Sequence, residues 1–320
     1  MNEINKGIRI FVSNRLGITS YQIPNPLFFP MMCGATYKSS QHEFSIPGDD
    51  SGDNISSKRD NYCEFTIQYW AWKNCDSSFI GLCHYHRFLS FSNKIYDENL
   101  EGMIHEFSLD DSSVKKYCLQ NYDTIVKEVL NSDALVNRAI EVNKLPVPKK
   151  SASTVREFWE SYDGVYFDKN LIDVLLQSIK IRTPKYYDAA VKYMEGNKHR
   201  GYNCYVMKKE FFKEMCDFQF VNLFNIEEKI EGLVDDYPRS IAYLGEILYG
   251  IYVFYLINQG KRVKELQLVY FEHSNNSCRR TFAYPLFLLK KNLEPFIYKI
   301  MPKASNQRLF LKKIYNMLAN

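Results

Sequence analysis

Residues 79–87 read FIGLCHYHR, and this stretch decides the fold that we expect. Phe79 to Tyr85 form a short, mainly apolar run, which is typical of a strand buried in a sheet. His84, His86 and Arg87 stand where this run ends, so basic side chains cluster at one point. The stretch therefore predicts a buried strand that delivers polar groups to one edge of a sheet.

Outward from this stretch, strands and helices alternate. Residues 8–13 (IRIFVS) predict a first strand, and residues 134–136 predict a third. Helices are expected between these strands at 62–74 and at about 114–131. This alternation is typical of a mainly parallel sheet flanked by helices, so we predict an α/β, Rossmann-like fold.

The remaining segments continue the mixture of helices and strands. Residues 38–61 are polar and predict a loop. We predict helices at about 153–162, 169–180, 184–195, 211–224 and from 235–238 to about 258, strands at 203–207 and 263–271, and one or two basic amphipathic helices over 283–320, broken near Pro302.

The composition excludes several classes of protein. Of 320 residues, 46% are hydrophobic and 15% aromatic, and the net charge is only +4, so the chain is not disordered. We find no run of about eighteen uncharged apolar residues that would predict a membrane span, and no secretion-signal layout. The eight cysteines form no CxxC pair, which favours buried thiols in a cytoplasmic protein. No nucleic-acid-binding motif occurs, so we expect no nucleic acid partner.

Positive charge is concentrated at the C-terminus. Residues 279–320 carry nine Lys or Arg and one acid, Glu294, so this segment is +8 while the other 278 residues sum to −4. Apolar residues are interleaved with the basic ones, a pattern that suits an anionic membrane surface. The alternative is a helix pair that packs on the body or forms a homodimer.

Polar groups follow the first two predicted strands. Ligands of open α/β sheets bind at the carboxyl ends of the strands. Asn14 and Arg15 end the first strand, while His84, His86 and Arg87 end the second. These groups can hold a nucleotide and stabilise a leaving diphosphate. The alternative is that they are ordinary packed or surface residues.

Residues 46–56 (IPGDDSGDNIS) place three carboxylates within five residues. Asp49, Asp50 and Asp53 can bind a cation, receive sugar hydroxyls or accept a proton, and Asp49 and Asp50 would hold a divalent ion if one is needed. Asn54, in the same loop, is a further candidate ligand-binding residue. The alternative is a solvated turn in which these side chains bind their own backbone.

The helix predicted over 62–74, with Asn61 as its N-cap, carries Glu64, Trp70 and Trp72. A carboxylate beside aromatic rings suits contact with a sugar or a nucleobase. The alternative is that the rings pack this helix into the core.

Two later segments add candidates. Arg200 and Asn203 lie beside a short strand and could face a phosphate group or a second substrate. Arg239 and Glu246 are seven residues apart and share one face of the late helix. Glu246 is a candidate general base, or the structural partner of Arg239.

These motifs resemble, in their order, a bacterial family of capsular and exopolysaccharide biosynthesis proteins long described as a domain of unknown function. The family pattern runs GDDTGDNIS, YCELT, YWAWKN and YIGLxHYRR; the segments here read GDDSGDNIS (48–56), YCEFT (62–66), YWAWKN (69–74) and FIGLCHYHR (79–87). The resemblance covers about residues 7–272 and is densest at 46–88. Arg239 and Glu246 match an Arg and a Glu of the family's late helix.

The chain departs from this family pattern at three places. His86 stands where the family has an arginine, although Arg87 is kept, and Arg200 replaces the usual histidine. Asn137, Arg138 and an insertion to Lys150 replace a basic stretch that contains proline.

The resemblance implies a glycosyltransferase with a GT-A-like fold, and some members are associated with galactofuranose transfer. Enzymes of this fold usually place Asp-x-Asp after the second strand, where it holds a divalent metal on the donor. Here His84-Tyr85-His86-Arg87 stands at that place, so a cationic cluster would stabilise the diphosphate without a metal. We expect residues 1–272 to form the GT-A-like domain and 273–320 a basic amphipathic helical extension.

The expected reaction moves galactofuranose or another hexose from a nucleotide-diphosphate sugar, most simply a UDP-sugar. The acceptor would be a lipid-linked or oligosaccharide intermediate of a capsular polysaccharide, exopolysaccharide or lipopolysaccharide O-antigen. No cofactor is certain, and Mn or Mg stays open. We expect a cytoplasmic protein, peripheral on the inner face of the membrane. The alternatives are a non-catalytic glycan-binding or assembly protein of the same fold, and a sugar-phosphate transferase of the same pathway.

Overall fold

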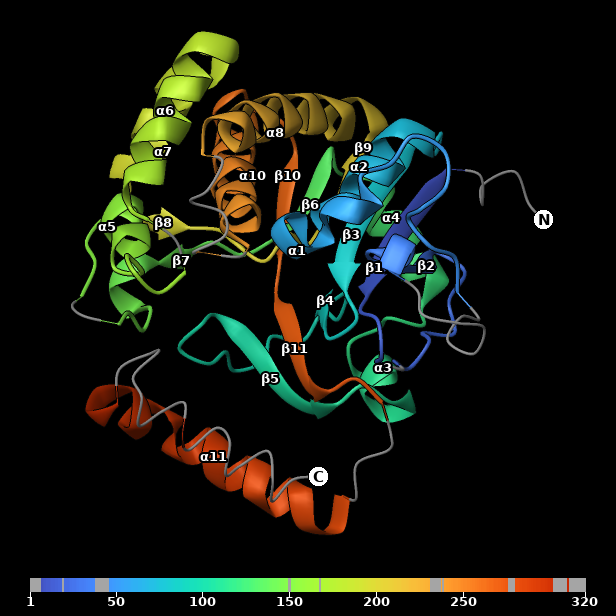
Figure 1. Ribbon diagram of the computed structural model, residues 1–320. Helices are drawn as coiled ribbons and strands as arrows, with labels where there is room; N and C mark the ends of the chain where they lie inside the picture. The colour runs from blue at the N-terminus through green and yellow to red at the C-terminus, as the bar shows by residue number, and fades with distance from the viewer. Residues whose placement is uncertain are drawn as a thin grey trace.

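The computed structural model describes residues 7–18, 20–37, 46–148, 151–166, 168–230, 237, 239–275, 280–301 and 310. Its centre is a nine-stranded sheet (Figure 1). The strands are β1 (Ile8–Asn14), β2 (Phe28–Met32), β3 (Phe79–His84), β4 (Arg87–Leu89), β5 (Met103–Ser108), β6 (Ala134–Asn137), β9 (Tyr205–Lys208), β10 (Val263–Leu266) and β11 (Leu268–His273). A separate pair joins β7 (Ile140–Glu141) to β8 (Lys198–His199).

The sheet is mixed, and its longest ladders are parallel. The strands run in the order β10-β6-β9-β3-β4-β11-β5, while β1 pairs with both β2 and β3. In the parallel β1–β3 ladder Ser13 lies opposite His84, and in the parallel β1–β2 ladder Asn14 lies opposite Met32. The carboxyl ends of these three strands therefore meet at one edge, which the sequence predicts for β1 and β3 but not for β2.

Helices cover both faces of the sheet (Figure 1). Side chains alternate along β1, so that Ile10 and Val12 join one apolar cluster and Phe11 joins the other. The helices are α1 (Arg59–Tyr62), α2 (Phe65–Asn74), α3 (Asp111–Lys116), α4 (Tyr122–Leu130), α5 (Val155–Glu160), α6 (Asn170–Arg182), α7 (Tyr187–Glu195), α8 (Lys209–Lys229), α10 (Ser240–Asn258) and α11 (Arg280–Ile300). Short 3₁₀ turns span Ala35–Tyr37, Ser56–Lys58, Val142–Lys144 and Pro184–Tyr186.

Helix α10 differs from one expectation. It is 19 residues long and apolar enough, by length and composition, to cross a membrane, although we expected no such segment. In the folded chain 72% of its most apolar window is buried against the rest of the protein. Its apolar character therefore matches that of a helix in the core, where it packs against α7 and α8.

Three predicted elements are divided in the structure. The helix predicted over 62–74 is interrupted at Cys63, where φ is 49°, so Asn61 lies within α1 and is not an N-cap. The helix predicted over 114–131 is interrupted at Cys118, where φ is 57°. The strand predicted over 263–271 is two strands, β10 and β11, which pair with β6 and β5 in different parts of the sheet.

Other predicted elements agree with the structure or lie outside it. The strands over 8–13, 79–85 and 134–136 are confirmed as β1, β3 and β6. Residues 235, 236 and 238 of the predicted helix start, and most of the segment after residue 301, lie outside the described residues. The expected domain boundary at residue 272 falls one position before the end of β11.

Candidate functional site

A pocket of about 360 Å³ lies at the edge of the sheet where β1, β2 and β3 end. Backbone hydrogen bonds hold these strand ends together: Tyr85 N–H donates to the Ser13 carbonyl and Cys33 N–H to the Asn14 carbonyl, both at 3.0 Å. The pocket is lined by Ser13, Asn14, Arg15, Cys33, Arg59, Asp60, Cys63, Glu64, His84, Tyr85, His86, Arg87 and Arg239.

Seven residues that the sequence analysis selected lie together in this pocket. They come from the end of β1, from the break between α1 and α2, from the segment between the end of β3 and the start of β4, and from the residue before α10, and they are Asn14, Arg15, Glu64, His84, His86, Arg87 and Arg239. Strand-end reasoning and the resemblance therefore select residues that meet in space, although they are up to 225 positions apart in the sequence, from Asn14 to Arg239.

Glu64 is the buried carboxylate of the pocket. The backbone turn at Cys63 separates α1 from α2 and leaves Glu64 facing His84, with 3.2 Å between its Oε1 and His84 Nε2. Asn203 Nδ2 donates to the same oxygen at 2.9 Å. Burial raises the pKa of Glu64, but the charge and hydrogen-bonding contributions of His84, together with the Asn203 hydrogen bond, lower that pKa to about 2. Glu64 is therefore ionised and anchors His84.

His86 has a different charge from the one expected. Burial, together with the neighbouring Arg87 and His84, lowers the pKa of His86 to about 2. The imidazole is therefore neutral near pH 7, so it offers a hydrogen bond and not a positive charge. It packs between aromatic rings, with centroids 4.2 Å from Tyr85 and 5.4 Å from Tyr270.

Arg87 is held by aromatic faces. It begins β4, where it lies opposite Tyr270 of β11. Its guanidinium carbon lies 5.0 Å from the ring centroid of Tyr202 and 5.8 Å from that of Tyr270. The Nε atom is buried and has no hydrogen-bond partner within the part of the chain that the structure describes. Among the described residues, no ion pair joins Arg87 to a carboxylate. Its remaining guanidinium N–H groups therefore line the pocket without an acidic partner.

Arg239 lines the pocket from the segment that precedes α10. It precedes α10 in a left-handed conformation, with φ 78°, and its Nε donates to Cys63 Sγ at 3.1 Å. Arg15, Arg59 and Arg87 complete a set of four arginines, against two acids, Asp60 and Glu64. Asp60 is bound to Arg59 at 2.9 Å and Glu64 to His84, so the pocket keeps an excess of positive charge suited to an anion.

The three carboxylates of the predicted loop do not line this pocket. Asp49 is fully buried and accepts hydrogen bonds from the Gly34 and Ala35 amides, at 3.0 and 2.9 Å, and from the hydroxyls of Ser56 and Thr66. These four donors give Asp49 a structural role, since its oxygens are already used. Among the other loop residues, Asp50 and Asp53 are exposed, Tyr69 OH donates to Asp53 at 3.1 Å, and Asn54 Nδ2 donates to the Gly52 carbonyl.

Neither predicted tryptophan lines the pocket. Trp70 donates its indole N–H to the Ser51 carbonyl at 2.8 Å, which holds the loop against α2. Trp72 stacks on Phe220 of α8 with 5.5 Å between ring centroids. Their contacts match the packing alternative that the sequence left open.

Three further candidates lie behind the pocket wall. Arg200 is buried and pairs with Glu265, and Asn203 supports Glu64. Glu246 is partly buried and accepts a hydrogen bond from the Tyr202 amide at 3.1 Å. Burial and the nearby charge of Glu64 raise the pKa of Glu246, and no ion pair joins it to Arg239 among the described residues. These three residues therefore have a structural role next to the pocket and do not line it.

Some pocket residues escaped the sequence analysis. Ser13, Cys33, Arg59, Asp60, Cys63 and Tyr85 also line it. Arg59 and Asp60 directly precede the motif at Tyr62, so their proximity to Glu64 was a usable signal. Cys33 had no such signal, because its position depends on the pairing of β2 with β1.

The residues of this pocket are not a typical set of ligands for a divalent cation. The part of the chain that the structure describes contains no cluster of three or more His, Cys, Asp or Glu side chains able to hold a metal ion. At the end of β3, guanidinium and imidazole groups stand where two carboxylates would be expected, and the Asp49 oxygens are already hydrogen-bonded. The described residues thus do not fit a metal.

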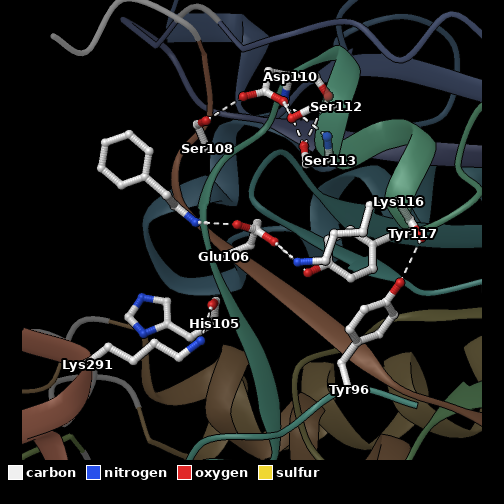
Figure 2. Close-up of polar contacts among 11 residues, drawn as sticks. Tyr96, His105, Glu106, Ser108, Asp110, Ser112, Ser113, Lys116, Tyr117 and Lys291 are labelled. Atoms are coloured by element: carbon white, nitrogen blue, oxygen red, sulfur yellow. Dashed lines mark hydrogen bonds and ion pairs between the residues drawn. The ribbon is translucent and has the colours of Figure 1, made fainter. Parts of the chain in front are cut away.

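A second hollow, of about 290 Å³, lies between β5 and α3. Its acidic groups already have partners: Glu106 binds Lys116 and Tyr117, and Asp110 caps α3 through Ser113 (Figure 2). These contacts stabilise the local structure, and we assign this hollow no chemistry.

Comparison with known proteins places the fold. A model of the family described as "Domain of unknown function (DUF4422)" matches residues 18–258. The chain is similar to the apo structure of the WbbM bifunctional glycosyltransferase, with a TM-score of 0.73 and 27% sequence identity, covering 83% of this chain and 45% of that one. The chain thus spans less than half the length of that protein. No curated protein matches. The structural likeness confirms the predicted GT-A-like fold.

Proposed function

The chain belongs to the family described as Domain of unknown function (DUF4422), and we propose that it is a glycosyltransferase whose donor is a nucleotide-diphosphate sugar. Two findings support this proposal. One is the likeness to a glycosyltransferase over 83% of the chain. The other is the pocket at the strand ends, which is where open α/β sheets bind ligands.

The observation that carries the proposal is the gathering of four arginines, Arg15, Arg59, Arg87 and Arg239, in one pocket. In the proposed reaction the bond between the sugar's anomeric carbon and the diphosphate oxygen breaks, and the electron pair stays with the diphosphate. Guanidinium groups fixed at that oxygen stabilise the charge that develops there. The acceptor hydroxyl forms the new bond to the anomeric carbon as its proton passes to solvent water, and the nucleoside diphosphate leaves.

The histidines have distinct parts in this proposal. His84 is oriented by Glu64, so its ring has a fixed position at the end of β3. His86 is neutral and can donate one hydrogen bond to a phosphate oxygen. The proposed reaction uses no metal ion, because the described residues do not fit one.

The substrates are part of the proposal. We propose a hexose donor, with galactofuranose and a UDP carrier as the first choices, and a glycan acceptor that is lipid-linked or an oligosaccharide. The product would belong to a capsular polysaccharide, exopolysaccharide or O-antigen. The proposed location of the reaction is the cytoplasm.

The proposal is tested by incubating the purified chain with a panel of nucleotide sugars and candidate acceptors, with and without manganese, and following the products by phosphorus NMR. A glycosyltransferase releases a nucleoside diphosphate. Release of a nucleoside monophosphate would instead identify a sugar-phosphate transferase. Binding of glycan with no turnover of any donor would identify a non-catalytic glycan-binding protein.

A thermal-shift screen of the same nucleotide sugars narrows the panel first, because a bound donor raises the melting temperature. The donor that gives the largest shift is then used in the turnover assay. If no nucleotide sugar stabilises the chain, the assignment of the pocket to a donor is wrong.

A further inference from the structure

Helix α11 lies along one side of the molecule, next to β5 and β11, with the rest of the described chain on one side of it only (Figure 1). Its contacts with the body are both polar and apolar. Lys290 pairs with Glu272, Lys291 donates to the His105 carbonyl at 3.1 Å, and Tyr298 OH donates to Glu101 at 2.9 Å (Figure 2 shows Lys291 beside His105). Phe287 adds an apolar contact with Phe107.

The opposite face of α11 is apolar and exposed. Leu289, Leu293, Phe296 and Ile300 recur at steps of four, three and four residues, so they form one stripe. Their exposed fractions are 55%, 43%, 62% and 56%, and Leu288 beside them is 40% exposed. The helix therefore carries apolar side chains on two sides, because Phe287 packs on the body while the stripe points away from it.

This exposure is not typical of the rest of the surface. Of the 15 large apolar residues that are exposed in the described chain, six lie on α11, and they are Tyr284, Leu288, Leu289, Leu293, Phe296 and Ile300. Contiguous apolar surface of this kind marks a binding face, since leaving it in water is unfavourable. The question is what covers it.

The surrounding charge identifies the occupant. Lys299 is exposed among the apolar residues, and the sequence after residue 301 adds Lys303, Arg308, Lys312 and Lys313 with no acid. A second copy would bring the same excess of positive charge to this face and would be repelled. A bilayer with anionic headgroups would attract the lysines and accept the apolar stripe at once.

We propose that the apolar stripe of α11 inserts into the interface of a membrane that contains anionic lipids, with Lys299 and the basic residues after it held at the headgroups. Helix α11 would then lie parallel to the membrane surface and attach the protein to it. This inference is independent of the sugar chemistry and goes beyond it.

The test uses the full chain and sedimentation with two kinds of vesicle, phosphatidylcholine alone and phosphatidylcholine with a quarter phosphatidylglycerol. The variant replaces Leu289, Leu293 and Phe296 with Ser. A matched control replaces three exposed apolar residues on other elements, Ile95, Leu130 and Ile181, with Ser; their exposed fractions are 63%, 54% and 60%. Circular dichroism confirms that each protein is folded.

We expect the parent and the control to bind the anionic vesicles, and the α11 variant to bind at least about tenfold more weakly, because three apolar side chains no longer insert. Neutralising Lys303, Arg308, Lys312 and Lys313 as Gln should weaken binding about fivefold per charge near the surface. Both effects are read without any sugar substrate, so failure of the proposed function leaves this test unchanged.

Three results would overturn the inference. One is equal binding of the parent and the α11 variant to anionic vesicles. Another is equal binding of the parent to both kinds of vesicle. The third is a dimer, seen by sedimentation velocity without lipid and lost in the α11 variant, in a protein that binds no vesicles; this would assign the stripe to a second copy.

Discussion

Arg87 is held in the pocket by two aromatic rings and by its strand. Tyr202 and Tyr270 hold its guanidinium between their rings, and its strand register opposite Tyr270 fixes the backbone. A group held this way needs little rearrangement when negative charge develops nearby, which is the condition for strong electrostatic stabilisation of a transition state. Arg87 is therefore where the proposed chemistry is most open to a test.

Replacing Arg87 with Ala should lower kcat by about 10²–10³ and leave the fold intact, because the variant loses a preorganised donor. Turnover of the nucleotide sugar identified in the thermal-shift screen measures this. The control is Arg138→Ala, which removes an arginine whose ion pair with Glu98, at 3.4 Å, lies away from the pocket. A folded Arg87→Ala protein with the parent rate would remove Arg87 from the mechanism.

Glu64 should make folding stability depend on pH. Its pKa is lowered in the fold to about 2 from an ordinary value of 4.5, so its stabilising effect is present above pH 4.5 and is lost as the pH falls toward 2. Glu64→Gln should therefore reduce the free energy of unfolding by roughly 3 kcal/mol at pH 7 and by less than half of that at pH 3.

Urea unfolding of the parent and of Glu64→Gln at the two pH values measures this difference. The exposed Glu157→Gln serves as the control, and its effect should stay small at both. A difference between the parent and Glu64→Gln that does not change with pH would show that Glu64 is not held ionised by His84.

At the residue scale, the sequence predicts the site best where a strand ends. His84, Arg87, Asn14 and Arg15 follow apolar runs, and parallel pairing brings such ends together. The protonation of His86 could not be predicted, because it depends on burial and on charges that meet only in the fold. The same holds for Asp49, whose donors come from residues 34, 35, 56 and 66.

The loop around Asp49 shows how one element is attached to another. Asp49 joins the loop to the 3₁₀ turn at Ala35–Tyr37 and to α2 through Thr66, and a backbone bridge between Met32 and Gly48 continues β2 into the loop. The three aspartates of this loop thus differ in role: Asp49 is buried and links the loop to its neighbours, whereas Asp50 and Asp53 are exposed. A pattern of carboxylates in a sequence does not distinguish these two uses.

Replacing Asp49 with Ala should lower the free energy of unfolding by on the order of 3 kcal/mol, because buried amide and hydroxyl donors lose their acceptor. Chemical denaturation measures the loss, with Asp53→Asn, an exposed neighbour, as the control. The milder Asp49→Asn variant should keep the parent kcat per folded molecule. A stable Asp49→Asn protein that has lost turnover would return Asp49 to the chemistry.

The breaks between helices were beyond prediction for a related reason. Cys63 and Cys118 adopt positive φ, a conformation that favours glycine and for which cysteine carries no sequence signal. The break at Cys63 matters most, since it directs both Cys63 and Glu64 into the pocket. Tertiary contacts such as the Arg239–Cys63 hydrogen bond stabilise the turn, and these involve residues 176 positions apart.

At the scale of the whole molecule, the alternation of apolar strands and helices was enough to predict the α/β class. The strands β1, β3 and β6 are mainly apolar because both faces of the sheet are covered, with Arg9 of β1 an exposed exception, and such runs are readily recognised. The antiparallel placement of β9 between β3 and β6 was not predictable, because periodicity says nothing of strand order. Strands β2, β4 and β5 were missed, since they are short or interrupted by polar residues.

The four arginines that meet in the pocket repel one another, so any multiply charged anion should relieve that repulsion and raise the melting temperature. We expect inorganic pyrophosphate at a hundredfold excess over its dissociation constant to raise it by about 5 °C, and the same concentration to have less effect on Arg87→Ala. Differential scanning fluorimetry measures both shifts, and equal shifts would contradict the assignment. Phosphate, citrate or sulfate in the buffer would therefore compete with a weakly bound substrate for the pocket, so that its turnover would be missed. Zwitterionic buffers are the appropriate medium for activity assays on this protein.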